Sequence, residues 1–343
     1  THNTVNELTA VAETHGSSWI DPAHDAAGNM TLAPKPGDEA TAAEGLVMTY
    51  DAWNRLAKVY KDDGGTTGEW DGTDTLIATY SYDGLRRRIR KVVKGDPDVT
   101  TDFYYNSSWQ ILEERKGEDI DPYAQYVWDI RYIDAPVVRF RDGNTDGDYD
   151  DGVDDTLYYT NDANMNVTAL VNTSGSVVER YAYDPYGKLT VLDADFSTDA
   201  DGQSDYDNEL LYCGYRRDNE TGLDQVRERY YHCTLGRWPV RDFEGYLEGP
   251  NLFEYVRSAP TTRLDPWGLE SWSYKPEDIK YHDIPEKTWI MADQAVQKQN
   301  RKTGRRYDYS NVMRKAREMR AEELNGRKAK RETVLKEEDE MPG

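Results

Sequence analysis

Hydrophobic and polar side chains alternate along several short stretches of the chain. In Leu76–Tyr82 and Val177–Tyr183, β-branched or aromatic residues recur at a period of two, and Val167–Val171 and Gln125–Trp128 show a similar pattern. Because the side chains of a strand point alternately to the two faces of a sheet, this period predicts β-strands. We therefore interpret residues 20–260 as a series of antiparallel β-hairpins.

The stretches are separated by turns that share one pattern. Each turn has a ring, then Asp, two variable residues and usually Gly or Asn; the four copies are His24–Met30, Tyr50–Leu56, Tyr82–Arg88 and Tyr183–Leu189. Asp opens a β-turn by accepting hydrogen bonds from nearby amides, and Gly or Asn tolerates the positive φ that closes it. Arg86 occupies that last position in the third copy, which predicts a strained turn or another turn type. Such hairpins bury little surface alone and need neighbours on both sides.

Composition favours a sheet with half-exposed faces. The chain has 26 Tyr against 5 Phe, and only 37% of its residues are hydrophobic. A tyrosine ring has one polar end, which suits cross-strand ladders better than a dry interior. The net charge of −23 weighs against nucleic-acid binding by the main body. No apolar run reaches the roughly 18 residues that a membrane-spanning helix needs.

The charge distribution indicates a boundary near residue 270. Residues 1–269 contain 25 Lys and Arg against 50 Asp and Glu, whereas residues 270–343 contain 17 against 15. We predict three parts: a hairpin array with acidic loops over 1–207, a module over 208–269 and a variable tail over 270–343. Helix formers dominate the tail, and they predict a charged helix over Ser310–Leu335.

The module over 208–269 carries many short motifs in one order. They are Tyr212–Arg216, Glu220–Leu223, Arg229–Tyr231, Leu235–Trp238, Arg241–Asp242, Asn251–Val256 and Asp265–Leu269. Together with the upstream turns, these motifs resemble the RHS (YD-repeat) family and its RHS-repeat-associated core, over roughly residues 20–269. The departures from the family pattern are Cys213, His232–Cys233 and Phe243.

The resemblance implies a mainly β fold: serial antiparallel hairpins of a YD-repeat β-shell, with a small, mostly α-helical C-terminal tail. In the family, the shell encloses a polymorphic segment that is often a toxin or effector. The implied partners are the chain's own tail and an immunity protein.

The resemblance also implies autoproteolysis between Leu269 and Glu270. Asp242 and Asp265 would form the acid pair, and Arg263 would tune that pair or steady the oxyanion. Two carboxylates held close share one proton, so one of them can activate a water while the other donates its proton.

The turn at Asp265 has an internal control in the sequence. Asp265–Gly268, with Pro266 at its second position and Gly268 at its fourth, fits a type I turn that would hold the scissile carbonyl near the acid pair. Asp184–Gly187 has Asp, Pro and Gly at the same three positions, with no sign of a domain boundary. The turn alone is therefore no evidence for catalysis, and a module that keeps the motif only as structure is the alternative.

An acidic loop, Asp142–Asp150, is a candidate calcium site. It has oxygen-bearing side chains at its odd positions and Gly147 at the sixth position of a calcium loop. The candidate ligands are Asp142, Asn144, Asp146, Asp148 and Asp150. Val153 stands where a bidentate Glu should be, so a solvated acidic turn is the alternative. A second acidic loop, Asp199–Asp207, is a sparser candidate.

Two cysteines and the tail add little chemistry. Cys213 and Cys233 fit no metal framework, so they form either a disulfide between neighbouring strands or two unpaired thiols. The basic run Lys298–Arg306 in the tail either contacts phosphate or forms a solvated helix face.

Three functional interpretations follow. The chain starts in mid-pattern at Thr1 without a signal peptide, so the first is a fragment of a longer, secreted or cell-surface protein. It would present its tail and release it by a single self-cleavage, without an external substrate. The second is a non-enzymatic surface module that binds carbohydrate or neighbouring cells and is stabilised by calcium. The third is an enzyme whose activity resides in the tail.

Overall fold

The computed structural model describes residues 1–11, 18–39, 45–64, 70–130, 132–142, 155–246, 249–269 and 272–273. The chain divides into two units, Thr1–Tyr274 and Lys275–Gly343, and every described residue belongs to the first. The predicted tail helix, Ser310–Leu335, lies outside the described residues. The predicted division of the chain at residues 207 and 269 stays a prediction.

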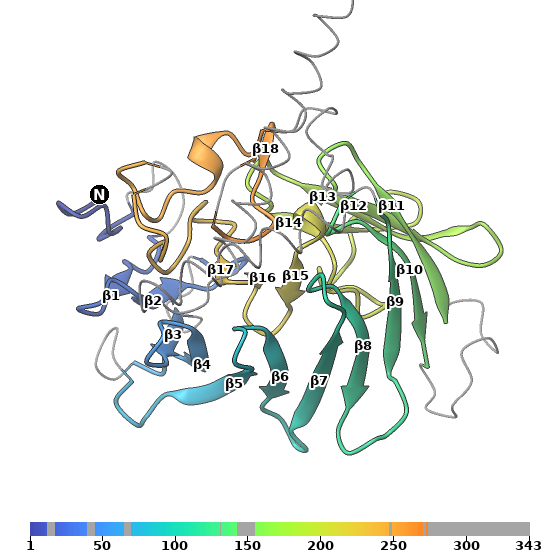
Figure 1. The fold of residues 1–343 in the computed structure, drawn as a ribbon, viewed down its shortest axis with the longest axis horizontal. Coiled ribbons are helices and arrows are strands. Elements are labelled where there is room, and N and C mark those ends of the chain that lie inside the picture. The colour runs from blue at the N-terminus through green and yellow to red at the C-terminus, as the bar shows by residue number, and fades with distance from the viewer. Residues whose placement is uncertain are drawn as a thin grey trace, which may run out of the picture. The chain divides into compact units, whose positions relative to one another are not determined.

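Fourteen antiparallel strands form one sheet, and their order in the sheet follows the chain (Figure 1). The strands are β1 Ala23–His24, β2 Met30–Pro34, β3 Gly45–Tyr50, β4 Leu56–Lys61, β5 Thr75–Tyr82, β6 Arg88–Val93, β7 Val99–Tyr105, β8 Ile111–Lys116, β9 Ala124–Trp128, β10 Pro136–Arg141, β11 Thr156–Asn161, β12 Val167–Val171, β13 Val177–Tyr183 and β14 Leu189–Asp193. The predicted mainly β fold of serial antiparallel hairpins is therefore confirmed for the described residues.

One hydrogen-bonded turn recurs between these strands. A side-chain oxygen accepts the amides two and four residues ahead; the oxygens belong to Asp25, Asp51, Asp83, Asn106, Asp162, Asn172 and Asp184. The fourth residue of each turn has a positive φ, from 57° at Asn54 to 93° at Gly187. Asp or Asn at the first position thus satisfies the amides that the turn leaves unpaired.

The turn that contains Arg86 is of the same kind, so of the two predicted alternatives another turn type is wrong and a strained turn agrees with the structure. Arg86 has a φ of 72°, a conformation that a residue with a side chain adopts at a cost. Its Nε donates to Glu228 Oε2 at 2.6 Å, and its guanidinium lies 4.7 Å from the ring centroid of Phe243. These contacts with the module offset the predicted strain.

The tyrosine that precedes the turn accounts for four of the 26 tyrosines. The hydroxyls of Tyr50, Tyr82, Tyr105 and Tyr183 each donate to a backbone carbonyl at 2.7 Å, on Met30, Leu56, Arg88 and Val167 respectively. Each acceptor is the first residue of the strand that leaves the preceding Asp turn of this kind. Phenylalanine would leave these carbonyls without that donor, at a cost of about 1 kcal/mol each.

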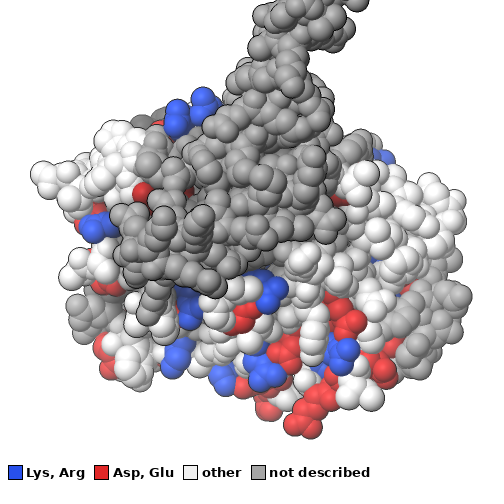
Figure 2. Space-filling model, viewed as in Figure 1, with Lys and Arg blue, Asp and Glu red and all other residues white. Residues whose placement is uncertain are grey.

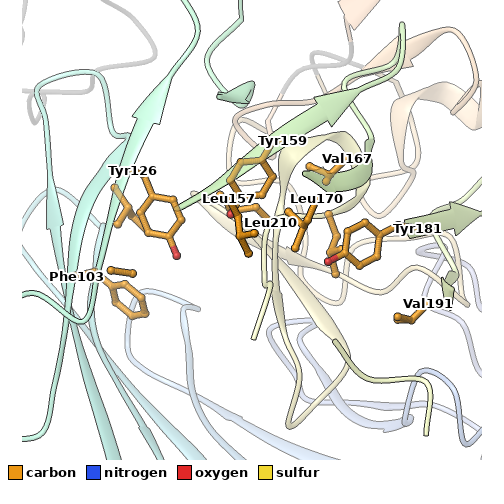
Figure 3. Close-up of a cluster of buried hydrophobic side chains, with 12 residues drawn as sticks. Phe103, Tyr126, Leu157, Tyr159, Val167, Leu170, Tyr181, Val191 and Leu210 are labelled. Carbon is orange, nitrogen blue, oxygen red and sulfur yellow. The ribbon is translucent and has the colours of Figure 1, made fainter. Parts of the chain in front are cut away.

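Residues 208–269 pack against the sheet at many points along its length. They form a three-stranded sheet of β15 (Arg216–Asp218), β16 (Leu223–Val226) and β17 (Arg229–Tyr231), and the short strand β18 (Arg263–Leu264) pairs with β19 (Trp272–Ser273). Figure 3 shows Leu210 of this module among side chains of the large sheet, including Tyr126, Leu157 and Leu170. A second core cluster joins β2–β5 to Leu223 and Tyr230.

Buried ion pairs also join the module to the sheet. Arg88 on β6 contacts Asp218 at 2.5 Å, and Arg216 on β15 contacts Glu114 on β8 at 2.7 Å. Near the two ends of the sheet, Lys188 in the β13–β14 turn lies 3.2 Å from Glu39, which follows β2. The sheet therefore curls, and the module lies against its inner side. On the face drawn in Figure 2, the visible acidic and basic side chains are interspersed.

The structure decides between the alternatives for the two cysteines. Cys213 and Cys233 are both buried and unbonded to each other, so the disulfide alternative is wrong. Burial raises the pKa of the Cys233 thiol to about 11, which keeps it protonated and unreactive at neutral pH. Among the described residues, no helix is long and apolar enough to cross a membrane.

Candidate functional site

Asp265 begins a buried turn directly after β18. Gly268 N donates to Asp265 O at 3.3 Å, and Leu269 N donates to Asp265 Oδ1 at 2.9 Å. The Asp265 side chain is almost fully buried, and residues 266–269 are buried with it. Gly268 has a φ of 70°, and a Cβ there would lie 2.9 Å from the carbonyl oxygen of Val226. Glycine is therefore needed both for the backbone conformation and for the close approach of β16.

A tyrosine hydroxyl fixes the backbone of Asp265. Tyr215 Oη accepts a hydrogen bond from Asp265 N at 3.2 Å and donates to Asp265 O at 3.0 Å. The same hydroxyl lies 3.1 Å from that of Tyr255. All three residues are buried, so the start of the turn is held by hydrogen bonds that solvent does not compete for.

Asp242, the predicted partner of Asp265, is held from several directions. Asp242 N donates to Leu252 O at 3.0 Å, and Asp242 Oδ1 accepts the amide of Glu244 at 2.8 Å. Phe243, which replaces the family's proline, is half-exposed and packs under Arg86. The Asp242 side chain faces the module interior and is 8% exposed.

Arg229 on β17 brings the two predicted aspartates together. Its Nη2 lies 2.9 Å from Asp242 Oδ2 and 3.8 Å from Asp265 Oδ2. Its Nε donates to the carbonyl of Gly268, and its guanidinium lies 4.3 Å from the ring centroid of Trp238. One buried cation thus offsets the repulsion between two buried carboxylates.

A small cavity opens beside this group. It has a volume of about 20 Å³, enough for a single water molecule. Its lining includes Asp242, Asp265, Arg229 and Leu269. The residue whose carbonyl is the predicted scissile group therefore borders the same water-sized space as both carboxylates.

The other predicted site residues are placed as follows. Arg263 lies on β18, opposite Ser273 and two residues before Asp265, and its predicted role on the oxyanion stays a prediction. Pro266 is buried between Asp265 and Gly268. Glu270, on the far side of the predicted cut, lies outside the described residues.

The calcium loop is mostly outside the described residues. Asp142 is buried at the end of β10, whereas Asn144, Asp146, Asp148 and Asp150 belong to the range that is not described. In the described ranges, no group of three or more His, Cys, Asp or Glu is arranged to hold a metal ion. In the second acidic loop, Asp199 Oδ1 accepts the amides of Asp201 and Gly202 at 3.0 and 2.7 Å. That loop is thus a self-capped turn, and calcium at Asp142 stays a prediction.

Arg229 is the site residue that sequence reasoning missed. It was visible only as one letter of the motif Arg229–Tyr231, and no spacing rule links it to Asp242 or Asp265. A buried arginine on a strand, in a chain with an excess of acidic residues, is the sole signal that could have indicated it.

The fold and this site define a class: a β-shell built from Asp-turn hairpins, with a buried carboxylate pair where the module ends. The fold is shared with a crystal structure of TcdB2-TccC3, at a TM-score of 0.50 and 22% identity over 72% of this chain and 11% of that one. No family model matches the chain.

Several curated proteins that are similar to the chain are toxin proteins. It is 26% identical over 296 residues to the tRNA nuclease WapA of Bacillus subtilis (strain 168), covering 78% of this chain and 12% of WapA. It is 27% identical over 227 residues to the toxin subunit YenC1 of Yersinia entomophaga, covering 66% and 22%. It is 40% identical over 60 residues to the toxin protein Tse5 of Pseudomonas aeruginosa, covering 18% and 5%. The chain is thus similar to RHS-type toxins, and it spans less than a quarter of the length of each of these relatives.

Proposed function

We propose that residues 1–269 form the closing end of a toxin shell and that the chain cuts itself once, between Leu269 and Glu270. The observation that carries this proposal is the convergence of Asp242, Asp265 and Leu269 on one water-sized cavity. The relatives are toxin proteins, which supports a releasable C-terminal segment. The reaction is a single turnover on the chain itself.

The proposed chemistry is hydrolysis of one peptide bond. A water in the cavity attacks the carbonyl carbon of Leu269, and one of the two carboxylates accepts the proton that the water loses. The other carboxyl group carries the one proton that the pair shares, and it delivers that proton to the nitrogen of Glu270 as the carbon–nitrogen bond breaks. The products are a carboxyl terminus at Leu269 and an amino terminus at Glu270, so atoms and protons balance.

Positioning supplies much of the rate in this scheme. Asp265 Oδ1 accepts the amide of Leu269, and Arg229 donates to the carbonyl of Gly268. Both polar groups of the peptide that precedes the scissile bond are therefore held in place. An attack within a prearranged group avoids the entropy cost of bringing the reactants together. We assign to Arg229 the role of holding both carboxylates toward the cavity.

The released segment, residues 270–343, is the proposed cargo. In this proposal the shell encloses the segment until the protein has left the producing cell. An immunity protein neutralises the segment inside the producing cell. The chain then works at the cell surface or outside the cell, and a target for the tail is left open.

The proposal is tested by expressing residues 1–343 and measuring intact masses. The expected result for the wild type is two species, one ending at Leu269 and one beginning at Glu270. Asp242→Asn should remain as one uncut chain with an unchanged far-ultraviolet circular dichroism spectrum. A wild-type chain that stays intact after prolonged incubation, or an Asp242→Asn chain that is cut at the wild-type rate, contradicts the proposal.

A further inference from the structure

The turn Asp265–Gly268, which we call the cleavage turn, is held by the large sheet as well as by its own module. The loop between β9 and β10 presents Asp134 to Arg227, which lies in the turn between β16 and β17. Arg227 Nη1 and Nη2 donate to the two carboxylate oxygens of Asp134 at 2.9 and 2.6 Å, and both side chains are less than a tenth exposed. A Cβ at Gly214 would lie 1.8 Å from Asp134 O, so this loop meets the module without a gap.

Arg227 passes this contact on to the cleavage turn. Its Nη1 also donates to the carbonyl of Pro266, and its guanidinium lies 5.0 Å from the ring centroid of Trp267. Pro266 and Trp267 are the two central residues of the turn that begins at Asp265. A bidentate carboxylate orients the guanidinium plane, so Asp134 determines how Arg227 meets that turn.

A second contact comes from the turn between β7 and β8. Trp109 lies edge-on to Trp267, with ring centroids 5.7 Å apart and an interplanar angle of 73°. Trp109 occupies the fourth turn position with a φ of 65°, where Gly28 and Gly187 stand in other turns. A bulky residue is strained in this conformation, and such strain persists where a local contact holds it. Trp109 makes such a contact with the cleavage turn.

We propose that Asp134 with Arg227, and Trp109, are positioning elements for the cleavage turn, so that self-cleavage requires β7–β10 of the sheet to have formed against the module. The inference rests on the proposed self-cleavage and adds a regulator to it. A chain that has not completed its shell would keep its tail attached. Neither Asp134, Arg227 nor Trp109 lines the cavity beside Asp242, so all three act through the backbone of the turn.

The sharpest variant is Trp109→Gly, which removes the buried ring while glycine prefers the positive φ at this position. The control is Phe196→Gly, which replaces an aromatic residue by glycine at the fourth position of the turn that follows β14. Phe196 has a φ of 72° and is 66% exposed. We expect Trp109→Gly to unfold at a lower temperature, because a buried ring is lost. Assayed well below that temperature, it should cleave at least about tenfold more slowly, and Phe196→Gly should cleave at the wild-type rate.

A second pair of variants tests the ionic contact. Asp134→Asn should slow cleavage by about tenfold or more, and Asp134→Glu, which keeps the charge, should restore part of the rate. The control is Asp102→Asn, which breaks a bidentate pair with Arg90 on the neighbouring strands β6 and β7. We expect that control to have no effect on the cleavage rate.

The outcomes separate this inference from the proposed function. If the wild type is cut while Trp109→Gly and Asp134→Asn are cut equally fast, the positioning role is wrong and the self-cleavage stands. If the wild type is never cut, self-cleavage is wrong, and amide hydrogen exchange across residues 265–269 becomes the readout. Faster exchange there in Trp109→Gly, but not in Phe196→Gly, supports the positioning role. Exchange at the wild-type rate in Trp109→Gly overturns that role.

Discussion

Two turns in this chain share one sequence pattern, but one begins at an exposed aspartate and the other at a buried one. Asp184–Gly187 and Asp265–Gly268 both read Asp-Pro-aromatic-Gly, and each Asp accepts the amide four residues ahead, at 2.9 Å in both cases. Asp184 is exposed at a hairpin tip, and its amide donates to the carbonyl of Lys188 within the same hairpin. Asp265 is buried, and its amide donates to Tyr215 from elsewhere in the module.

The difference between the two turns comes from what surrounds them. The exposed turn closes a hairpin, and the carbonyls of its Pro185 and Tyr186 accept the hydroxyls of Tyr212 and Tyr231 at 2.9 Å each. The buried turn places its carboxylate 3.8 Å from Arg229, which also contacts Asp242, beside a cavity large enough for one water molecule. A turn motif therefore supplies a shape, and chemistry requires a second carboxylate and an orienting cation that the motif does not contain.

The largest expected effect comes from removing that cation. Arg229→Met leaves Asp242 and Asp265 buried without the guanidinium between them, so we expect a loss of about 3–5 kcal/mol in unfolding free energy. The matched change at the exposed turn, Lys188→Met, removes a side chain that is 46% exposed and should cost at most about 1 kcal/mol. Urea unfolding of both variants measures the difference, and equal losses would remove the contrast between the turns.

The buried module should also make stability depend on pH. Burial lowers the pKa of His232 from 6.5 to about 4, against an opposing hydrogen bond with Pro34 O at 2.8 Å. The unfolded chain then binds a proton that the folded chain refuses, so this contribution is complete above pH 6.5 and is lost as the pH falls toward 4. The loss should reach about 3 kcal/mol.

The measurement for His232 is the difference in unfolding free energy between the wild type and His232→Gln at several pH values. A difference is needed because burial raises the pKa of Asp224 to about 7, which acts in the opposite sense over the same range. The wild type should lose its advantage over the variant between pH 6.5 and 4. A difference that stays constant with pH would mean that the pKa of His232 is the same in the folded and the unfolded chain.

The turn glycines should rank by what surrounds them. Gly268→Ala places a Cβ 2.9 Å from Val226 O at a positive φ, so we expect a loss of about 2 kcal/mol or more. Gly175→Ala has a similar φ of 79° but open space around it, and should cost about 1 kcal/mol. Thermal unfolding of the two variants gives the ranking, and only Gly268→Ala should slow self-cleavage.

The smallest expected effect concerns the tyrosine before the exposed turn. Tyr183→Phe loses the hydrogen bond to Val167 O and should cost about 1 kcal/mol without changing cleavage. Tyr104→Phe, at a position 47% exposed on β7, is the control and should be neutral. If Tyr183→Phe slowed cleavage, the exposed turn and the cleavage turn would not be independent.

The hairpin array could be predicted from the sequence because its determinants are local. An Asp and a positive-φ residue three positions later define each turn, and alternation over five to eight residues defines most of the flanking strands. Arg86 and Trp109 show the limit of that reasoning. Both adopt the glycine-like conformation because distant partners, Glu228 and Trp267, hold them there.

The site was predictable only in part. Asp242, Asp265 and Leu269 were indicated by the motifs of the module, and they border one cavity. The place of Arg229 depends on how β17 packs against residues 242–252 and 265–269, which no local pattern encodes. The clamp from Asp134 and Trp109 was missed for the same reason, because it joins residues that are 93 or more positions apart in the chain.

The most direct test of the account compares the two turns in one assay. Asp265→Asn and Asp184→Asn make the same chemical change in the same four-residue motif, and intact-mass measurement after expression reports cleavage in each. The account predicts that Asp184→Asn is cut after Leu269 like the wild type and that Asp265→Asn stays whole. A cut Asp265→Asn chain, or equal impairment of both variants, would contradict the claim that the buried carboxylate performs the cleavage.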